Sequence, residues 1–83
     1  MDVETIKIKQ LSFKIVEEIL LEKDYESKSE VLLNAVGRAK KSREKNMPES
    51  VIMAHNDALK TLQGLAFSDM LELKQLIKSS QGK

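Results

Sequence analysis

The sequence predicts a small, mainly α-helical chain with a short N-terminal strand. Apolar residues recur at three- and four-residue spacing in four separate stretches, which is the pattern of amphipathic helices. Only the first few residues alternate between apolar and polar side chains, as a half-buried strand does. The 83 residues include three Gly and one Pro, and 41% are hydrophobic, so a folded, largely helical chain is expected. The alternative fold class is a small four-helix bundle.

Length, charge and residue types limit the classes of protein that fit. A domain of this size buries only about 60–65% of its unfolded surface. Because Cys is absent and His55 is the only histidine, we expect a homodimer or higher oligomer to supplement the core. The net charge of +1 argues against non-specific coating of nucleic acid. No apolar run approaches the ~18 residues of a membrane span, and Asp2 and Glu4 do not suit a signal peptide, so we expect a cytoplasmic protein without membrane association.

Residues 3–9 have the period of a strand. Ile6 and Ile8 fall on one face of this stretch, and the residues between and beside them are polar. A lone strand of this length would be unstable, because its backbone groups have no partner. We therefore expect residues 3–9 to pair with a second chain. The alternatives are a flexible arm and the start of the first helix.

Two helices are predicted in the first half of the chain. Ile15 and Ile19 belong to the apolar stripe of a helix over residues 13–23. Ser27 and Glu30, three residues apart, form a capping box in which each side chain can satisfy a backbone amide. A second helix therefore starts at about this point.

Basic residues gather at the end of the second helix, over residues 38–45. The patch consists of Arg38, Lys40, Lys41, Arg43 and Lys45. Such a run is typical of the solvated C-terminal end of a helix, where positive charge suits the helix dipole. Gly37 precedes the patch and suggests a close helix crossing.

Pro48 divides the chain into an N-terminal half, residues 1–46, and a helical hairpin, residues 47–83, although one compact domain is the alternative. We expect one hairpin helix over residues 48–63 and another from about residue 68, followed by a disordered tail over residues 79–83. An apolar seam on the hairpin is the expected surface for oligomerisation or for a protein partner. Its residues are Ile52, Leu59, Leu62, Met70, Leu73 and Ile77.

The order of strand, helix and capped helix over residues 3–41 resembles that of ribbon-helix-helix proteins. Residues 25–36 read Tyr-Glu-Ser-Lys-Ser-Glu followed by aliphatic residues and Ala. This segment is similar to the start of the second helix in ParD-type antitoxins and in the wider CopG/Arc repressor family. Counted back from Ser27, Ile6 and Ile8 fall where that family has its inward strand residues.

This resemblance implies a dimeric DNA-binding transcriptional regulator, either an antitoxin or a mobile-element repressor. Two paired strands would enter the major groove of an operator, where Thr5, Lys7 and Lys9 would contact bases. Helix-start amides at Ser27, Lys28 and Ser29 would bind a phosphate. The implied dimer core comprises Ile6, Ile8, Ile15, Ile19, Leu32 and Val36. The hairpin after Pro48 corresponds to the segment with which ParD-type antitoxins wrap their toxin.

The second hypothesis for the function is a small helical module that inhibits or tethers a protein partner. Short connections would let all four apolar stripes pack into one bundle, without any DNA-binding ribbon.

No group of side chains has the pattern of a catalytic or metal site. His55 is a single histidine without Cys or a placed carboxylate, and the adjacent Glu17 and Glu18 diverge by about 100° on a helix. The three glycines are isolated, so no phosphate-binding loop is present. We expect no enzymatic activity, no cofactor, no metal and no small-molecule substrate.

Overall fold

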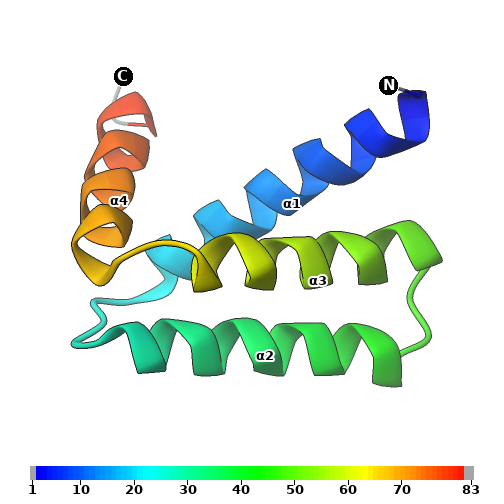
Figure 1. The fold of residues 1–83 in the computed structure, drawn as a ribbon, viewed down its shortest axis with the longest axis horizontal. Helices are drawn as coiled ribbons and strands as arrows, with labels where there is room; N and C mark the ends of the chain where they lie inside the picture. Colours follow the sequence, from blue (N-terminus) through cyan, green and yellow to red (C-terminus); the bar gives the residue numbers. More distant parts are fainter. Residues whose placement is uncertain (1, 82–83) are drawn as a thin grey trace.

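The computed structural model describes residues 2–81, and within them it contains four helices and no strand (Figure 1). The helices are α1 (Val3–Glu22), α2 (Lys28–Glu44), α3 (Glu49–Gln63) and α4 (Phe67–Gln81). Helices α2 and α3 lie side by side and antiparallel, α1 crosses α3 obliquely, and α4 stands beyond the end of α3 (Figure 1). The mainly α prediction is confirmed, and the arrangement is a compact four-helix domain.

The predicted strand over residues 3–9 is wrong, because these residues form the first two turns of α1. Asp2 caps the helix, and its carboxylate accepts a hydrogen bond from the Thr5 amide at 2.8 Å. Ile8 packs against the core two turns before Ile15, so the apolar stripe continues towards the N-terminus. A helix satisfies its backbone groups within one chain, which a lone strand cannot do.

Helix α3 is the centre of the core, because both α1 and α2 pack against it. Its inward face carries Ala54, Ala58 and Leu62, each with no exposed surface. The two small alanine side chains let neighbouring helices approach closely. The fully buried large side chains from the other helices are Val16, Ile19, Leu20, Val31 and Met70. Since α3 packs on both helices of the N-terminal half, the two halves share one core.

The turn between α1 and α2 is held by the capping box and by a buried tyrosine. The Ser27 hydroxyl accepts a hydrogen bond from the Glu30 amide at 3.4 Å, and the Glu30 carboxylate accepts one from the Glu26 amide at 2.6 Å. The Tyr25 hydroxyl donates to the carbonyl of Ile19 at 2.6 Å. Ser27 therefore caps α2 as predicted, and the Glu30 carboxylate satisfies a backbone amide, although that amide belongs to Glu26 and not to the cap residue.

The turn between α2 and α3 lies close to its predicted position. Asn46 follows α2 with a φ of 52°, in the left-handed region that ends a helix, and Pro48 directly precedes α3. Gly37 does not mark a helix crossing within residues 2–81. A Cβ added there would meet no atom within 4 Å, so Gly37 lies on the outer side of α2.

Helix α4 is longer at its end than the sequence pattern predicts. It continues to Gln81, so the disordered tail expected from residue 79 is wrong for residues 79–81. Residues 82–83, the rest of that expected tail, lie outside the described part of the chain.

Candidate functional site

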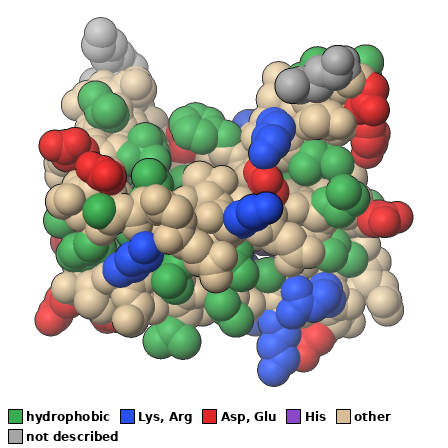
Figure 2. Space-filling model, in the orientation of Figure 1, with side chains coloured by type: hydrophobic (Ala, Val, Ile, Leu, Met, Phe, Trp, Pro, Cys, Tyr) green, Lys and Arg blue, Asp and Glu red, His purple; other side chains and the backbone are tan. Residues whose placement is uncertain are grey.

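The N-terminal half of α1 and helix α4 diverge from each other, and α3 lies beneath the space between them (Figure 1). The space-filling view shows a notch between these two arms of the molecule (Figure 2). A cavity of about 210 Å³ lies in it, which we call the α1–α4 groove. The groove is lined by Lys9, Ser12, Phe13 and Val16 of α1, Asp57 and Thr61 of α3, and Leu73 of α4.

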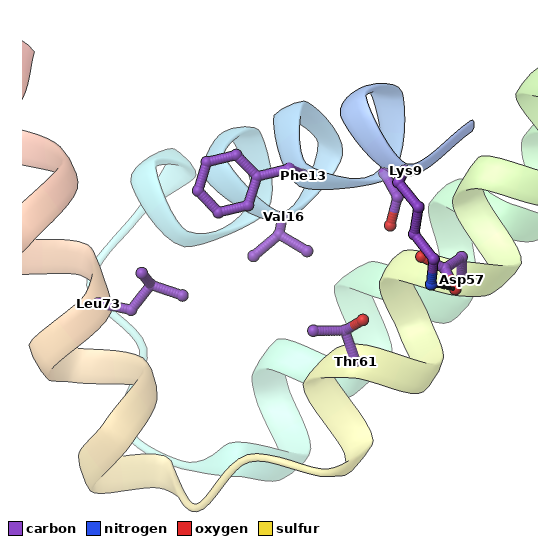
Figure 3. A pocket seen from close by; sticks show the side chains of 7 residues that line it. Lys9, Phe13, Val16, Asp57, Thr61 and Leu73 are labelled. Atoms are coloured by element: carbon purple, nitrogen blue, oxygen red, sulfur yellow. Dashed lines mark hydrogen bonds and ion pairs between the residues drawn. The ribbon is translucent and has the colours of Figure 1, made fainter. Parts of the chain in front are cut away.

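The wall of the α1–α4 groove is mostly apolar. Phe13 of α1 and Leu73 of α4 border the same space, and Val16 and Thr61 line its other side, toward α3 (Figure 3). Phe13 is 54% exposed, although Val16, one turn further along α1, is buried in the core. A large aromatic side chain at the mouth of an apolar groove is the type of residue that anchors protein interfaces.

An ion pair closes one end of the α1–α4 groove. The Lys9 ammonium donates to the Asp57 carboxylate at 2.9 Å (Figure 3). Partial burial by itself would raise the pKa of Asp57. Hydrogen bonds from Lys9 and Ser12, together with the charge of Lys9, nevertheless hold that pKa below its ordinary value. The pair ties α1 to α3 and leaves the centre of the groove to the apolar side chains.

A second, more open hollow also borders Phe13. It has a volume of about 610 Å³ and is lined by Lys9, Gln10, Phe13, Lys14 and Glu17, all from α1. Phe13 therefore borders both hollows, and a partner lying across them would cover much of the exposed ring.

Lys74 holds helix α4 in the position that forms the far wall of the groove. Its ammonium donates to the Lys23 carbonyl at 2.6 Å and to the Asp24 carboxylate at 2.9 Å. The Lys74 side chain is only 6% exposed, so these two acceptors offset the cost of burying its charge. The flanking residues Met70 and Ile77 are buried in the core.

The residues predicted to contact DNA bases lie on α1 and not on a ribbon. The Thr5 amide is bonded to the Asp2 cap, Lys7 is exposed, and Lys9 is paired with Asp57 at the groove. Without strands in residues 2–81, these three side chains cannot line one face of a two-stranded ribbon as the resemblance implied.

The predicted phosphate-binding residues lie at the start of α2, where two of them already bond within the chain. Ser27 caps the helix, and the Lys28 ammonium donates to the Gln63 carbonyl at 2.8 Å. Ser29 is exposed.

The residues predicted for a dimer core are divided between the interior and the surface. Ile15 and Ile19 are buried in the chain's own core, Ile8 and Leu32 pack at its edge, and Ile6 and Val36 are about half exposed. The predicted partner-binding seam is divided similarly. Leu62, Met70 and Ile77 are buried, Ile52 and Leu59 are half-buried, and Leu73 alone of the six lines the α1–α4 groove.

The basic patch is also divided by the helix that carries it. Arg38, Lys41 and Lys45 line a third hollow with His55, whereas Lys40 and Arg43 are exposed and do not line it. Across residues 2–81, no three His, Asp or Glu side chains form a group that could ligate a metal.

Five of the residues that line the groove were not predicted as site residues, namely Ser12, Phe13, Val16, Asp57 and Thr61, and Phe13 is the most prominent of them. It precedes the buried residues Val16 and Leu20 by three and seven positions, so helical spacing places it on the flank of the buried stripe of α1. Its ring is nevertheless 54% exposed, because α1 and α4 diverge at this point and no helix covers it.

None of the four helices described for residues 2–81 is long and apolar enough to cross a membrane. Comparison of the chain with protein-family models, with characterised proteins and with solved structures finds no match.

Proposed function

We propose that this chain is a helical protein-binding module that receives an amphipathic helix of a partner protein in the α1–α4 groove. The observation that carries the proposal is Phe13, a large aromatic side chain that is 54% exposed at the mouth of an apolar groove. Binding there would tether or inhibit the partner. It requires no catalytic group of this chain.

The size of the groove does not favour a drug-sized ligand. Its volume of about 210 Å³ is smaller than the ~300–1,000 Å³ of pockets that enclose such ligands. The exposed apolar surface also continues along α1 beyond the groove, through Ile6 and Val3. Residues 3–13 of a helix span about 15 Å, which matches roughly three turns of a partner helix.

The shape of the site favours a helix as the occupant. Three helices form its walls, so a further helix would pack against them as helices pack elsewhere in the domain. An amphipathic helix presents apolar residues at positions i, i+3 or i+4, and i+7, in a row that fits such a groove. Burying Phe13 against that row would contribute about 1.5–3 kcal/mol.

The test uses a phage-displayed library of helical peptides selected against the full chain. Selected peptides should carry apolar residues at helical spacing, and their binding should shift the amide resonances of residues around Phe13, Thr61 and Leu73. Phe13→Ala should weaken binding by about tenfold or more. The stability of the free chain should change little, since the side chain is exposed.

Leu33→Ala is the matched control, because Leu33 is 73% exposed but lies on α2 and does not line the groove. It should bind the selected peptides as the parent chain does. The proposal is wrong if Phe13→Ala and Leu33→Ala bind alike, or if the peptides map elsewhere. It is also wrong if the chain self-associates and Phe13→Ala returns it to a monomer, because a second copy would then be the occupant.

Operator binding by this chain stays a prediction from the resemblance. A gel-shift measurement with duplex DNA tests it. Since residues 3–9 are helical, such binding would have to use another surface than a two-stranded ribbon.

A further inference from the structure

A separate hollow lies where α2 ends and α3 begins. It has a volume of about 220 Å³ and is lined by Arg38, Lys41, Ser42, Lys45, Met47 and His55, and we call it the basic hollow. In Figure 2, Lys and Arg side chains gather at the lower right, over the C-terminal end of α2. None of these residues lines the α1–α4 groove.

Helical spacing brings three of the five cations of the basic patch to one side. Arg38, Lys41 and Lys45 follow each other at three- and four-residue spacing, so their side chains share one face of α2. Lys40 and Arg43 lie on another face and do not line the hollow. The hollow therefore concentrates positive charge that the sequence spreads over eight residues.

Much of this positive charge is not neutralised within the chain. Arg38 pairs with Glu18 at 3.3 Å and with Glu22 at 3.5 Å, both on α1. No carboxylate of residues 2–81 lies within 4 Å of the ammonium of Lys41 or Lys45. A concave surface lined by cations of this kind attracts an anion.

His55 adds a group whose charge can adapt to a ligand. Its Nδ1 is buried and has no hydrogen-bond partner among the described residues. Burial lowers the pKa of His55, the charge of Arg38 lowers it further, and Glu18 acts in the opposite direction. A negative charge placed in the hollow would raise that pKa again.

We propose that the basic hollow binds a phosphate group, carried as a phosphomonoester whose organic part lies against Met47. Lys41 and Lys45 would donate charge-assisted hydrogen bonds to the phosphate oxygens. The apolar side chain of Met47 provides a surface that a bare anion would not use. A nucleic-acid backbone fits less well, because it needs a row of cations, and Lys40 and Arg43 point away from the hollow.

The test is an NMR titration of the full chain with inorganic phosphate and with phenyl phosphate, at constant ionic strength. His55 is the only histidine, so its ring protons report directly on the hollow. Both anions should cause saturable shifts of His55 and of the amides of residues 41–47. Phenyl phosphate should bind more tightly, and the pKa of His55 should rise in the bound state.

Two double variants with the same change in net charge separate the basic hollow from general electrostatics. Lys41→Gln with Lys45→Gln should weaken phosphate binding by about tenfold or more. Lys40→Gln with Arg43→Gln should leave it within about twofold. Thermal unfolding of both variants checks that they fold as the parent does.

Several results would overturn the proposal. The first is NMR shifts that do not saturate as the anion is added. The second is an equal loss of phosphate affinity in the two double variants, and the third is phenyl phosphate that binds no more tightly than inorganic phosphate. Duplex DNA would be the ligand instead if it binds more tightly than phenyl phosphate and if both double variants weaken DNA binding equally.

Discussion

Lys74 shows how one buried cation sets the position of a whole helix. The sequence around it reads as an apolar seam, and the charge of Lys74 by itself would suggest a residue on the solvent side of α4. Its ammonium instead turns inwards and bonds to Lys23 and Asp24 in the turn after α1. A hydrogen bond from a charged donor such as this ammonium contributes about 1.5–3 kcal/mol.

Lys74→Met is expected to lower the free energy of unfolding at neutral pH and to flatten its dependence on pH in the acid range. A hydrogen bond from Lys74, with the charges of Lys74 and Lys78, holds the pKa of Asp24 below its ordinary value of 3.8. Asp24 therefore contributes stability above that pH, and the contribution is lost as the pH falls through its pKa in the folded state. Urea unfolding at a series of pH values measures both effects.

Lys40→Met serves as the control for this variant, since Lys40 is exposed and forms no ion pair in the structure. Two results would contradict the role given to Lys74. One is the same loss of stability in both variants, and the other is a free energy of unfolding for Lys74→Met that depends on acid pH as that of the parent chain does.

At the scale of the elements, α1 differs most from the pattern in its sequence. Ile6 and Ile8 are two residues apart, which fits a strand, but Ile8 is also seven residues before Ile15, which fits a helix. The Asp2 cap and the packing of Ile8 on the core favour the second period. The same extension carries Phe13 into the middle of the helix and beside α3 and α4, so the α1–α4 groove depends on it.

Asp2→Ala is expected to destabilise the start of α1, because the Thr5 amide loses its acceptor. Backbone chemical shifts of residues 3–9 should be helical in the parent chain. Their amide hydrogen exchange should become faster in the variant.

Ser27→Ala provides the comparison for Asp2→Ala, since it removes the cap of α2 and should affect the first turn of that helix only. Extended-chain shifts for residues 3–9 in the parent would show that the helix assigned there is wrong.

At the scale of the whole molecule, α3 makes the two halves of the sequence depend on each other. The buried faces of α1 and α2 pack mainly against Ala54, Ala58 and neighbouring residues of α3. Direct contact between α1 and α2 is smaller than the contact of either with α3. A division of the chain at Pro48 therefore separates the first two helices from the element that covers their apolar faces.

Residues 1–46 alone are expected to be largely unfolded, because removing α3 exposes the apolar faces of α1 and α2. Residues 47–83 should behave in the same way, and an equimolar mixture should regain helicity. Circular dichroism measures all three samples, and the full chain should unfold in a single transition. A stable helical dimer of residues 1–46 would contradict this view and would favour an independent N-terminal half.

The sequence predicts most of the helical content, but less of the candidate site. Ser27 and Glu30, and the interruption at Pro48, are local signals, and each lies at the expected helix boundary. The residues of the α1–α4 groove come from three helices, and their meeting depends on how those helices cross. The seam predicted on the hairpin supplies only Leu73 to that groove, because its other members lie in the core or at its edge.

By itself, the sequence determined that the chain forms amphipathic helices, where α2 and α3 begin, and that positive charge collects near the end of α2. These properties follow from residue spacing and from hydrogen bonds over a few residues. Tertiary structure decided, through the packing of Ile8, between the two periods of residues 3–9, and it alone decided that Phe13 borders a groove and that Lys41, Lys45 and His55 share a hollow. The physical reason is that these outcomes depend on which apolar faces pack together, and such packing joins residues far apart in the chain.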